Sequence, residues 1–237
     1  MSNLIVGIGQ CGANIIKDIP DDIKSPDWQV IFLDGQDINL KTISSHYDNI
    51  YIFCGLGGQM AFQYAAEIMS KCRLYTANLL SFCILPFKVE GDLRYKRAKE
   101  TLNKINKIAD ITVVQPNDNL SPDDNLSLMN KPIVATTIAS IKQSHKPLFY
   151  TLSAIIDSTG TNTGLKNFIS SEHINIYVND TRLKNLVSEA LNSNGRISTP
   201  DGVRNKMQEI WADYQSGKPI SNNIFEVELP PVDTDKE

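Results

Sequence analysis

The sequence has few of the residues that build metal, redox or nucleic-acid sites. Its four cysteines form no CxxC pair, and its three histidines, His46, His145 and His173, have no HxxxH or HxH spacing. These absences exclude the common zinc motifs and indicate reduced thiols. The net charge of -4 at pH 7 excludes a global attraction to nucleic acid or anionic lipid. We therefore expect no nucleic-acid partner and no protein-built metal site.

Long apolar runs and a basic leader are also missing. The start, MSNLIVGIGQCG, has no basic residue, and its apolar run stops at Gly7. No later segment approaches about 18 uncharged apolar residues. The sequence thus predicts a cytoplasmic protein without a transmembrane segment. It also has no GxSxG elbow, and no nucleophile has a base partner recognisable by spacing.

Short apolar runs alternate with stretches of helical spacing. The expected strands are Leu4–Gly7, Gln29–Leu33, Ile50–Cys54, Leu79–Phe87, Ile111–Val114 and Ile174–Val178. The expected helices are Gln10–Ile19, Gln59–Cys72, Leu93–Ile108, Asn125–Gln143 and Arg182–Leu191. Solid apolar runs are typical of strands covered on both faces. This order predicts an α/β fold, a doubly wound, mostly parallel sheet with helices on both faces.

A glycine loop joins the first expected strand to the first expected helix. Gly7, Gly9 and Gly12 form GxGxxG, where backbone N–H groups and a helix N-terminus can meet an anion. The loop predicts phosphate binding, and a tight turn without a ligand is the alternative. Asp34 ends the second strand about 20 residues later, where a dinucleotide fold places its ribose-binding acid. An NAD-dependent oxidoreductase is therefore one hypothesis.

Three further segments lie in the same order as those of a known family. They are YIFCGLGGQM (51–60), LPFKVEGDLRYKRAKETL (85–102) and ITVVQPNDNL (111–120). Together with GIGQCGANI they resemble the nucleotide-binding half of the FtsZ/tubulin superfamily. GQCG is similar to the tubulin loop, and Asn14 falls where FtsZ-like proteins carry asparagine. PFKVEG followed by Arg94 resembles the FtsZ segment PFxxEGxxR, and VQPNDNL resembles IPNDKL.

The resemblance implies a guanine nucleotide, GTP or GDP, across the carboxyl ends of the strands. Backbone N–H groups of the two glycine loops would hold the phosphates, and Gln10 could also reach a Mg²⁺ ion. Glu90 would accept a ribose hydroxyl, Arg94 would lie near the ribose or phosphates, and Asn117 would bind the guanine edge. The candidate nucleotide-binding residues are Gly9, Gln10, Cys11, Gly12, Asn14, Asp34, Gly55, Gly57, Gly58, Glu90, Arg94 and Asn117.

Simpler interpretations of three of these residues stay open. Glu90 and Arg94 are four residues apart at a helix start, so they could form only a surface pair. Asn117 follows a proline, and Asn-Asp there is also an ordinary turn and cap signal. The basic stretch RYKRAKETLNKINK (94–107) is interpreted as a solvated helix face over an apolar stripe.

The sequence departs from the family at the terminal phosphate and at catalysis. GLGGQMAF replaces a glycine/threonine loop, and only about fifteen residues separate DGQD (34–37) from the third strand. Thr137 falls about where the family's central helix presents a base-contacting Asp or Asn. The segment SAIIDSTGTNTGLKNF contains Asp157 but no NxDxxD-like pair to position water in a neighbouring subunit. We therefore expect weak or absent GTP hydrolysis.

The expected organisation is a nucleotide-binding domain followed by little else. Residues 1–145 would form that domain with the start of the central helix, 146–216 a reduced second domain, and 217–237 an extended or disordered tail. The expected function is nucleotide-regulated self-association, or docking on a polymer of another FtsZ/tubulin-like subunit, with a possible partner for the tail. A pseudo-GTPase interaction module that binds no nucleotide is the alternative.

Overall fold

The computed structural model describes residues 2–22, 28–33, 43, 45–119, 131–142, 151–152, 154–155, 174–180 and 183. They form one six-stranded sheet in the order β2-β1-β3-β4-β5-β6. The strands are β1 (Asn3–Ile8), β2 (Trp28–Leu33), β3 (Tyr47–Gly55), β4 (Thr76–Leu85), β5 (Ile111–Pro116) and β6 (Asn175–Val178). Neighbouring strands are parallel except β5 and β6, which are antiparallel. The predicted mostly parallel sheet is confirmed.

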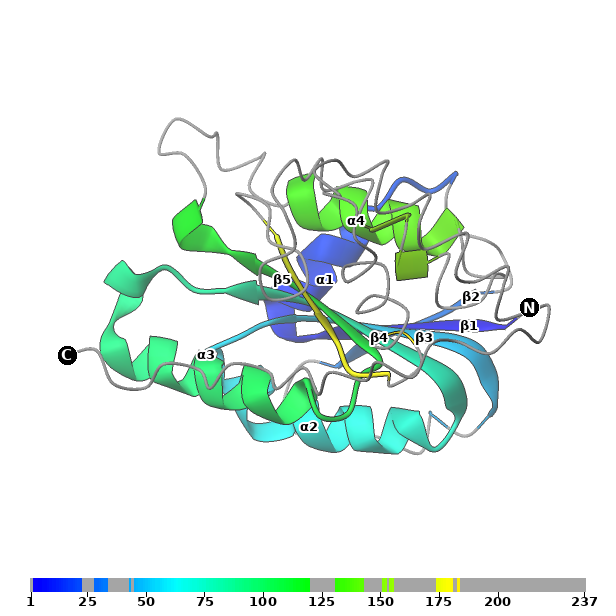
Figure 1. The fold of residues 1–237 in the computed structure, drawn as a ribbon, viewed down its shortest axis with the longest axis horizontal. Coiled ribbons are helices and arrows are strands. Elements are labelled where there is room, and N and C mark those ends of the chain that lie inside the picture. Colours follow the sequence, from blue (N-terminus) through cyan, green and yellow to red (C-terminus); the bar gives the residue numbers. More distant parts are fainter. Residues whose placement is uncertain are drawn as a thin grey trace, which may run out of the picture.

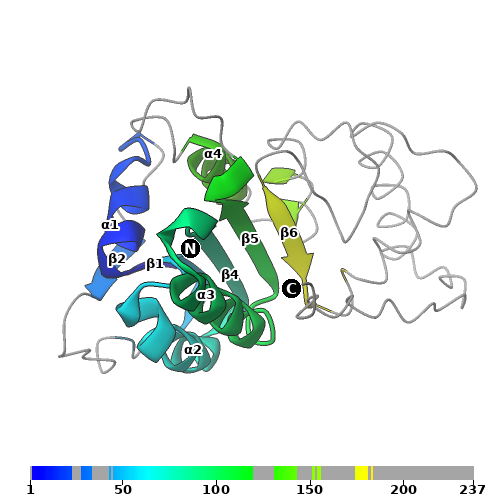
Figure 2. The same ribbon diagram turned by 90° about the vertical axis from the view of Figure 1, so that its left-hand side faces the viewer.

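Helices cover both faces of this sheet (Figure 1). The helices are α1 (Gly9–Lys17), α2 (Gln59–Arg73), α3 (Asp92–Ile105) and α4 (Lys131–Lys142), with short 3-10 turns η2 (Lys88–Glu90) and η3 (Asn117–Asn119). Figure 2 shows α2 and α3 side by side on one face, with α1 and α4 on the other. The predicted helices 10–19, 59–72 and 93–108 are thus present with slightly different ends.

Side-chain alternation along the strands divides the core into two layers. In β1, Ile5 packs in the layer under α1 and α4, whereas Leu4, Val6 and Ile8 pack under α2 and α3. Every residue of β1 is buried, so its apolar run is continuous. This is the pattern of a parallel strand covered on both sides.

The chain changes direction across the sheet at β1, because β2 pairs on one side of it and β3 on the other. In open parallel sheets such a switch point leaves a crevice at the carboxyl ends of the two strands. Gly12 allows α1 to lie close to β3, because a Cβ atom on Gly12 would sit 2.3 Å from the Phe53 carbonyl oxygen. The fold therefore prepares a site between the ends of β1 and β3.

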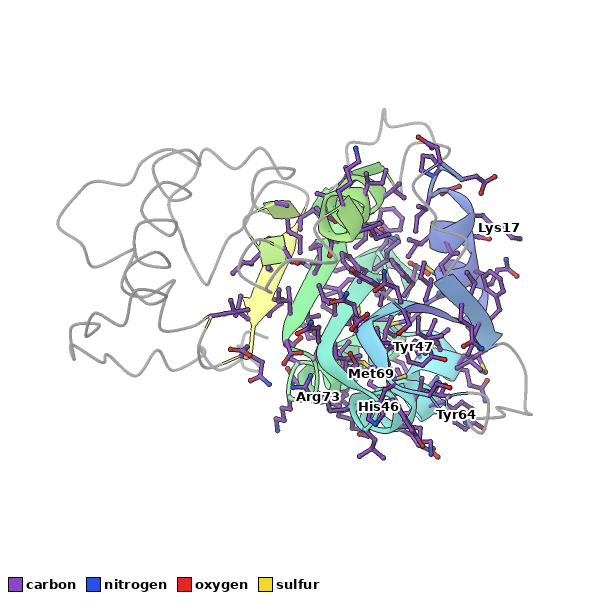
Figure 3. The ribbon with its side chains drawn as sticks, turned by 90° about the vertical axis from the view of Figure 1, so that its right-hand side faces the viewer. Lys17, His46, Tyr47, Tyr64, Met69 and Arg73 are labelled. Carbon is purple, nitrogen blue, oxygen red and sulfur yellow. The ribbon has the colours of Figure 1, made fainter. Side chains whose placement is uncertain are left out.

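The amino end of the sheet is held together by paired polar groups. Asp110 is buried, and its carboxylate accepts two hydrogen bonds from Arg73, at 2.6 and 2.8 Å, and one from the Leu79 N–H at 2.8 Å. Asn3, Asn49 and Asn78 lie in register on three strands, with amide hydrogen bonds of 3.0 and 3.1 Å. Figure 3 marks Arg73, which ends α2 at this side.

Several predictions concern residues outside the described ranges. They are Asp34, Asp157, the helix 182–191, the first part of the helix 125–143 and the tail 217–237. The strand expected at 174–178 is present as β6, at the edge of the sheet. The domain boundary at 145 remains a prediction. Within the part of the chain that the structure describes, no helix has the length and apolar character needed to cross a membrane.

Candidate functional site

A pocket of about 310 Å³ lies at the carboxyl ends of β1, β3 and β4. It brings together residues from five separate segments of the chain. The predicted residues that line it are Gly9, Gln10, Cys11, Gly55, Gly58, Glu90, Arg94 and Asn117. In Figure 1 this end of the sheet lies on the left, where β4 leads into α3. The crevice expected at the switch point is therefore a real cavity.

Two helices begin at the pocket without side-chain caps. The N-cap residues are Ile8 for α1 and Gly58 for α2, and neither makes a side-chain cap hydrogen bond. Neither helix has an acidic residue in its first turn. Backbone N–H groups of a first helical turn have no partner within the helix, and the helix dipole adds positive charge there. Two such ends facing one cavity make a site for an anion.

Gly57 sets the shape of the second loop. Its φ of +84° is a conformation that side-chain-bearing residues rarely adopt, and a Cβ there would lie 2.8 Å from the Arg94 carbonyl oxygen. This glycine therefore lets the loop before α2 pack against the start of α3. Although Gly57 does not line the pocket, it positions Gly58 and Arg94, which do.

Glu90 and Arg94 form both a local pair and part of the pocket wall. One Glu90 oxygen accepts a hydrogen bond from the Phe87 N–H at 2.8 Å, and the other pairs with Arg94 Nη1 at 2.9 Å. The Arg94 side chain is 51% exposed and the Glu90 side chain 28% exposed. The predicted surface pair is therefore present, and a ligand contact at these two residues remains a prediction. Glu90 holds the Arg94 guanidinium at the mouth of the pocket.

Asn117 carries an unsatisfied polar atom. It follows β5 in η3, lines the pocket, and its Oδ1 atom is buried without a hydrogen-bond partner among the described residues. A buried acceptor without a partner costs about 1–3 kcal/mol. A ligand that donates an N–H or O–H to this oxygen would remove that cost. Its neighbour Asp118 is occupied, because it accepts from the Lys88 N–H at 3.1 Å.

Three predicted residues lie beside the pocket or outside it. Gly12 is a buried residue of α1 and acts in packing, and Gly57 acts through its loop, as described above. Asn14 is exposed and accepts a hydrogen bond from Gln10 Nε2 at 2.8 Å. Asn14 therefore orients a pocket residue. Asp34 lies outside the described residues, so its ribose contact remains a prediction.

The structure adds pocket residues that the sequence motifs did not indicate. Ile8, Leu56, Met60, Ile84 and Pro86 line the cavity with apolar surface. Met60 comes from the first turn of α2, and its Cβ lies 3.5 Å from the position of a Cβ on Gly9. The two phosphate-loop candidates therefore meet at Met60. The sequence signal for this apolar wall was the segment GLGGQMAF, which has larger residues where the resembling family has small ones.

Burial keeps the cysteines near the site neutral. Burial is the main cause that raises the pKa of the Cys11 thiol to about 11, and the nearby Cys83 raises it further. The Cys54 and Cys83 sulfur atoms lie 3.5 Å apart, and their hydrogen bond, together with burial, raises the pKa of Cys54. A neutral Cys11 does not repel an anion at pH 7, as a thiolate would. The thiols are therefore compatible with a phosphate site.

The central helix does not present Thr137 to the pocket. Thr137 is fully buried in α4, and its Oγ1 donates to the Ile133 carbonyl at 2.7 Å. The start of α4 is instead attached to the sheet through the Ile133 N–H, which donates to the buried Gln115 Oε1 at 3.1 Å. At this position the chain has a structural contact where the family has a base contact.

Comparisons with known proteins find FtsZ proteins over part of the chain. No family model matches the chain. Cell division protein FtsZ 1 of Pyrococcus horikoshii is 37% identical over 73 residues, which cover 31% of this chain and 20% of the relative. Cell division protein FtsZ of Methanothermobacter thermautotrophicus is 27% identical over 114 residues, which cover 48% of this chain and 26% of the relative. The chain therefore matches only about a fifth to a quarter of these relatives' length.

A solved structure of a mutant FtsZ from M. jannaschii has the same fold. Its TM-score is 0.53 at 18% identity, and the superposition covers 65% of this chain and 62% of that chain. The sequence relatives and this fold neighbour carry the same family name. Part of the chain is thus similar in sequence to archaeal FtsZ proteins, and its sheet and helices have the fold of an FtsZ structure.

Proposed function

We propose that the pocket binds a guanine nucleotide and that the bound nucleotide controls self-association or docking on a polymer. The observation that carries this proposal is that one pocket is lined both by Asn117, whose buried Oδ1 has no partner among the described residues, and by two uncapped helix N-termini. Guanine offers N–H donors on its edge, and its phosphates suit the helix ends. Glu90 and Arg94, on the wall of the same pocket, would contact the ribose and phosphates.

The shape of the second loop supports a preference for GDP over GTP. The helix α2 begins at Gln59, so the side chains of Gln59 and Met60 form the pocket wall. The volume of about 310 Å³ is at the lower end of the range for small-molecule sites. A terminal phosphate would need space beside the N-terminus of α2 that the Gln59 and Met60 side chains occupy. Weak or absent hydrolysis is part of the same proposal.

A Mg²⁺ ion would have limited support from the chain itself. The Gln10 side chain lines the pocket, and its amide nitrogen is already bonded to Asn14, so its oxygen could face the ion. Mg²⁺ is usually bound by carboxylates, waters and substrate phosphates. Glu90, the pocket carboxylate, is bonded to Arg94 and Phe87. The nucleotide's phosphates would therefore provide most of the negative charge around the ion.

The first test is to identify any small molecule that the purified protein carries. We expect denaturation to release guanine nucleotide, and chromatography against GDP, GTP and NAD standards to identify it. In a thermal-shift comparison, GDP should raise Tm most, because only a ligand of the native state stabilises it. Protein without nucleotide and without any shift would indicate the non-binding interaction module. A shift with NAD alone would indicate the oxidoreductase.

The second test measures turnover. At high protein concentration we expect little GTP hydrolysis, and rapid hydrolysis that grows with concentration would contradict the proposal. Light scattering with GDP, GTP or no nucleotide would measure self-association. A cytoplasmic location and a tubulin-like cytoskeletal role belong to the same proposal.

A further inference from the structure

A basic face runs along α3 and into the turn after it. Five cationic side chains in residues 95–107 contribute to it, and Glu100 is the one carboxylate of that stretch. The five are Lys96, Arg97, Lys99, Lys104 and Lys107, all exposed or partly exposed. None of the five forms an ion pair with a described residue. On a chain with a net charge of -4, this is a local reversal of sign.

Aromatic rings hold some of these cations in place. Arg97 and Lys104 lie over the Phe62 ring, with distances to the ring centre of 5.4 and 5.7 Å. Lys99 lies 5.0 Å from the centre of the Tyr95 ring. Phe62 belongs to α2, which packs beside α3 on the same face of the sheet (Figure 2). The face thus combines fixed positive charges with aromatic surface between them.

One segment of the same chain has the complementary chemistry. Residues 225–237, FEVELPPVDTDKE, contain five carboxylates and one lysine. Phe225, Val227 and Leu229 alternate with Glu226 and Glu228. In an extended chain, alternate side chains point to opposite sides, so the apolar residues would share one side and these carboxylates the other. Such a segment can turn its carboxylate side toward the cations of the basic face.

The intervening chain is long enough for contact within one molecule. Residues 184–224 separate Leu183 from the acidic segment, and an extended chain covers ~3.3 Å per residue. Individual exposed ion pairs are weak in water. A tether raises the effective concentration to roughly millimolar, which allows several weak pairs to act together. A nucleic acid is disfavoured as the occupant, because the net charge of the chain repels it.

We propose that the segment 225–237 docks in cis on the basic face of α3. Its carboxylates would lie opposite Lys96, Lys99 and Lys104. The segment would then cover the flank of the molecule next to the pocket, because α3 begins at the pocket wall with Arg94. This docking does not depend on nucleotide binding.

Digestion of the full chain by a glutamate-specific protease tests the proposal. Cleavage after Glu226 and Glu228 requires the segment to leave the face, so docking slows it. We expect about tenfold slower cleavage at low salt than in the variant Lys96→Gln, Lys99→Gln. We expect 0.5 M NaCl to remove the difference, because salt screens exposed charges. A reporter peptide of the same sequence corrects for the effect of salt on the protease.

Matched variants keep the outcome interpretable. Lys17→Gln removes an exposed lysine from α1, on the opposite side of the sheet (Figure 3), and should leave cleavage unchanged. Lys104→Gln, Lys107→Gln tests the far end of the same face and should accelerate cleavage. Equal rates in wild type and both α3 variants would overturn the proposal. Protection that grows with protein concentration would also overturn it, in favour of docking on a second copy.

Discussion

At the amino end of the sheet, Asp110 and three asparagine side chains pair with one another, whereas at the carboxyl end unpaired polar groups line one pocket. Asp110 accepts three hydrogen bonds, and the asparagines on β1, β3 and β4 bond to each other. At the other end, two helices begin uncapped and Asn117 Oδ1 is buried without a partner among the described residues. This difference supports a structural role for the amino end and is the basis for proposing a ligand site at the carboxyl end.

The largest expected effect is at the amino end. Asp110→Ala would remove the Arg73 pair and the acceptor of the Leu79 N–H, and we expect a loss of about 3 kcal/mol in the free energy of unfolding. This value is toward the lower limit for buried pairs because the Arg73 side chain is 39% exposed. Urea denaturation measures it. Asp48→Ala, at an exposed aspartate that bonds the Ser2 N–H, should cost under ~1 kcal/mol.

A smaller loss should follow from alkaline pH, at both ends of the sheet. Burial raises the pKa of Cys11, near the pocket, to about 11 and that of Cys72, near the amino end, to about 12, from 9.0. Unfolded chains would ionise first, so stability is complete below pH 9 and falls as pH rises toward 11 and 12. Linkage gives a total of somewhat under ~3 kcal/mol by pH 10.

Urea denaturation from pH 7 to pH 10 measures this loss, and single variants separate the two thiols. Cys72→Ala and Cys11→Ala should each make the fall of stability with pH shallower, whatever they do at pH 7. If the slope of both variants equals that of wild type, the thiols are not the source of the pH dependence.

Binding should respond at the carboxyl end, with little change in stability. Asn117→Ala removes the proposed acceptor for guanine, and we expect about tenfold weaker GDP binding, which corresponds to ~1.4 kcal/mol. The free energy of unfolding of the ligand-free protein should stay the same or rise, because the unsatisfied buried oxygen is removed. Calorimetric titration and denaturation measure the two quantities. A loss of stability with unchanged GDP affinity would show that Asn117 has a structural role and does not bind the nucleotide.

The elements of the fold could be predicted from the sequence because the strands are solid apolar runs and the helices have regular apolar spacing. The pocket glycines were predictable for the same local reason, since Gly9 and Gly58 stand directly between a strand and a helix. The role of Gly12 depends on how closely α1 approaches Phe53, which is a tertiary distance. The Asp110–Arg73 pair joins residues 37 positions apart, and no local pattern indicates it.

The smallest expected effect concerns Thr137, which tests whether α4 belongs to the site. Thr137→Val removes one hydrogen bond, to the Ile133 carbonyl, and keeps the side-chain shape. We expect a loss under ~1 kcal/mol in unfolding free energy and no change in GDP affinity, because Thr137 is fully buried outside the pocket.

Thr101→Val is the matched control for Thr137→Val. Thr101 in α3 is also buried and makes the same kind of bond, to the Arg97 carbonyl at 2.8 Å. The two variants should lose similar stability, and neither should change nucleotide affinity. If Thr137→Val alone weakened GDP binding about tenfold, α4 would present a group to the base, as the central helix of the family does. The ligand-binding region would then extend from the carboxyl end of the sheet to α4.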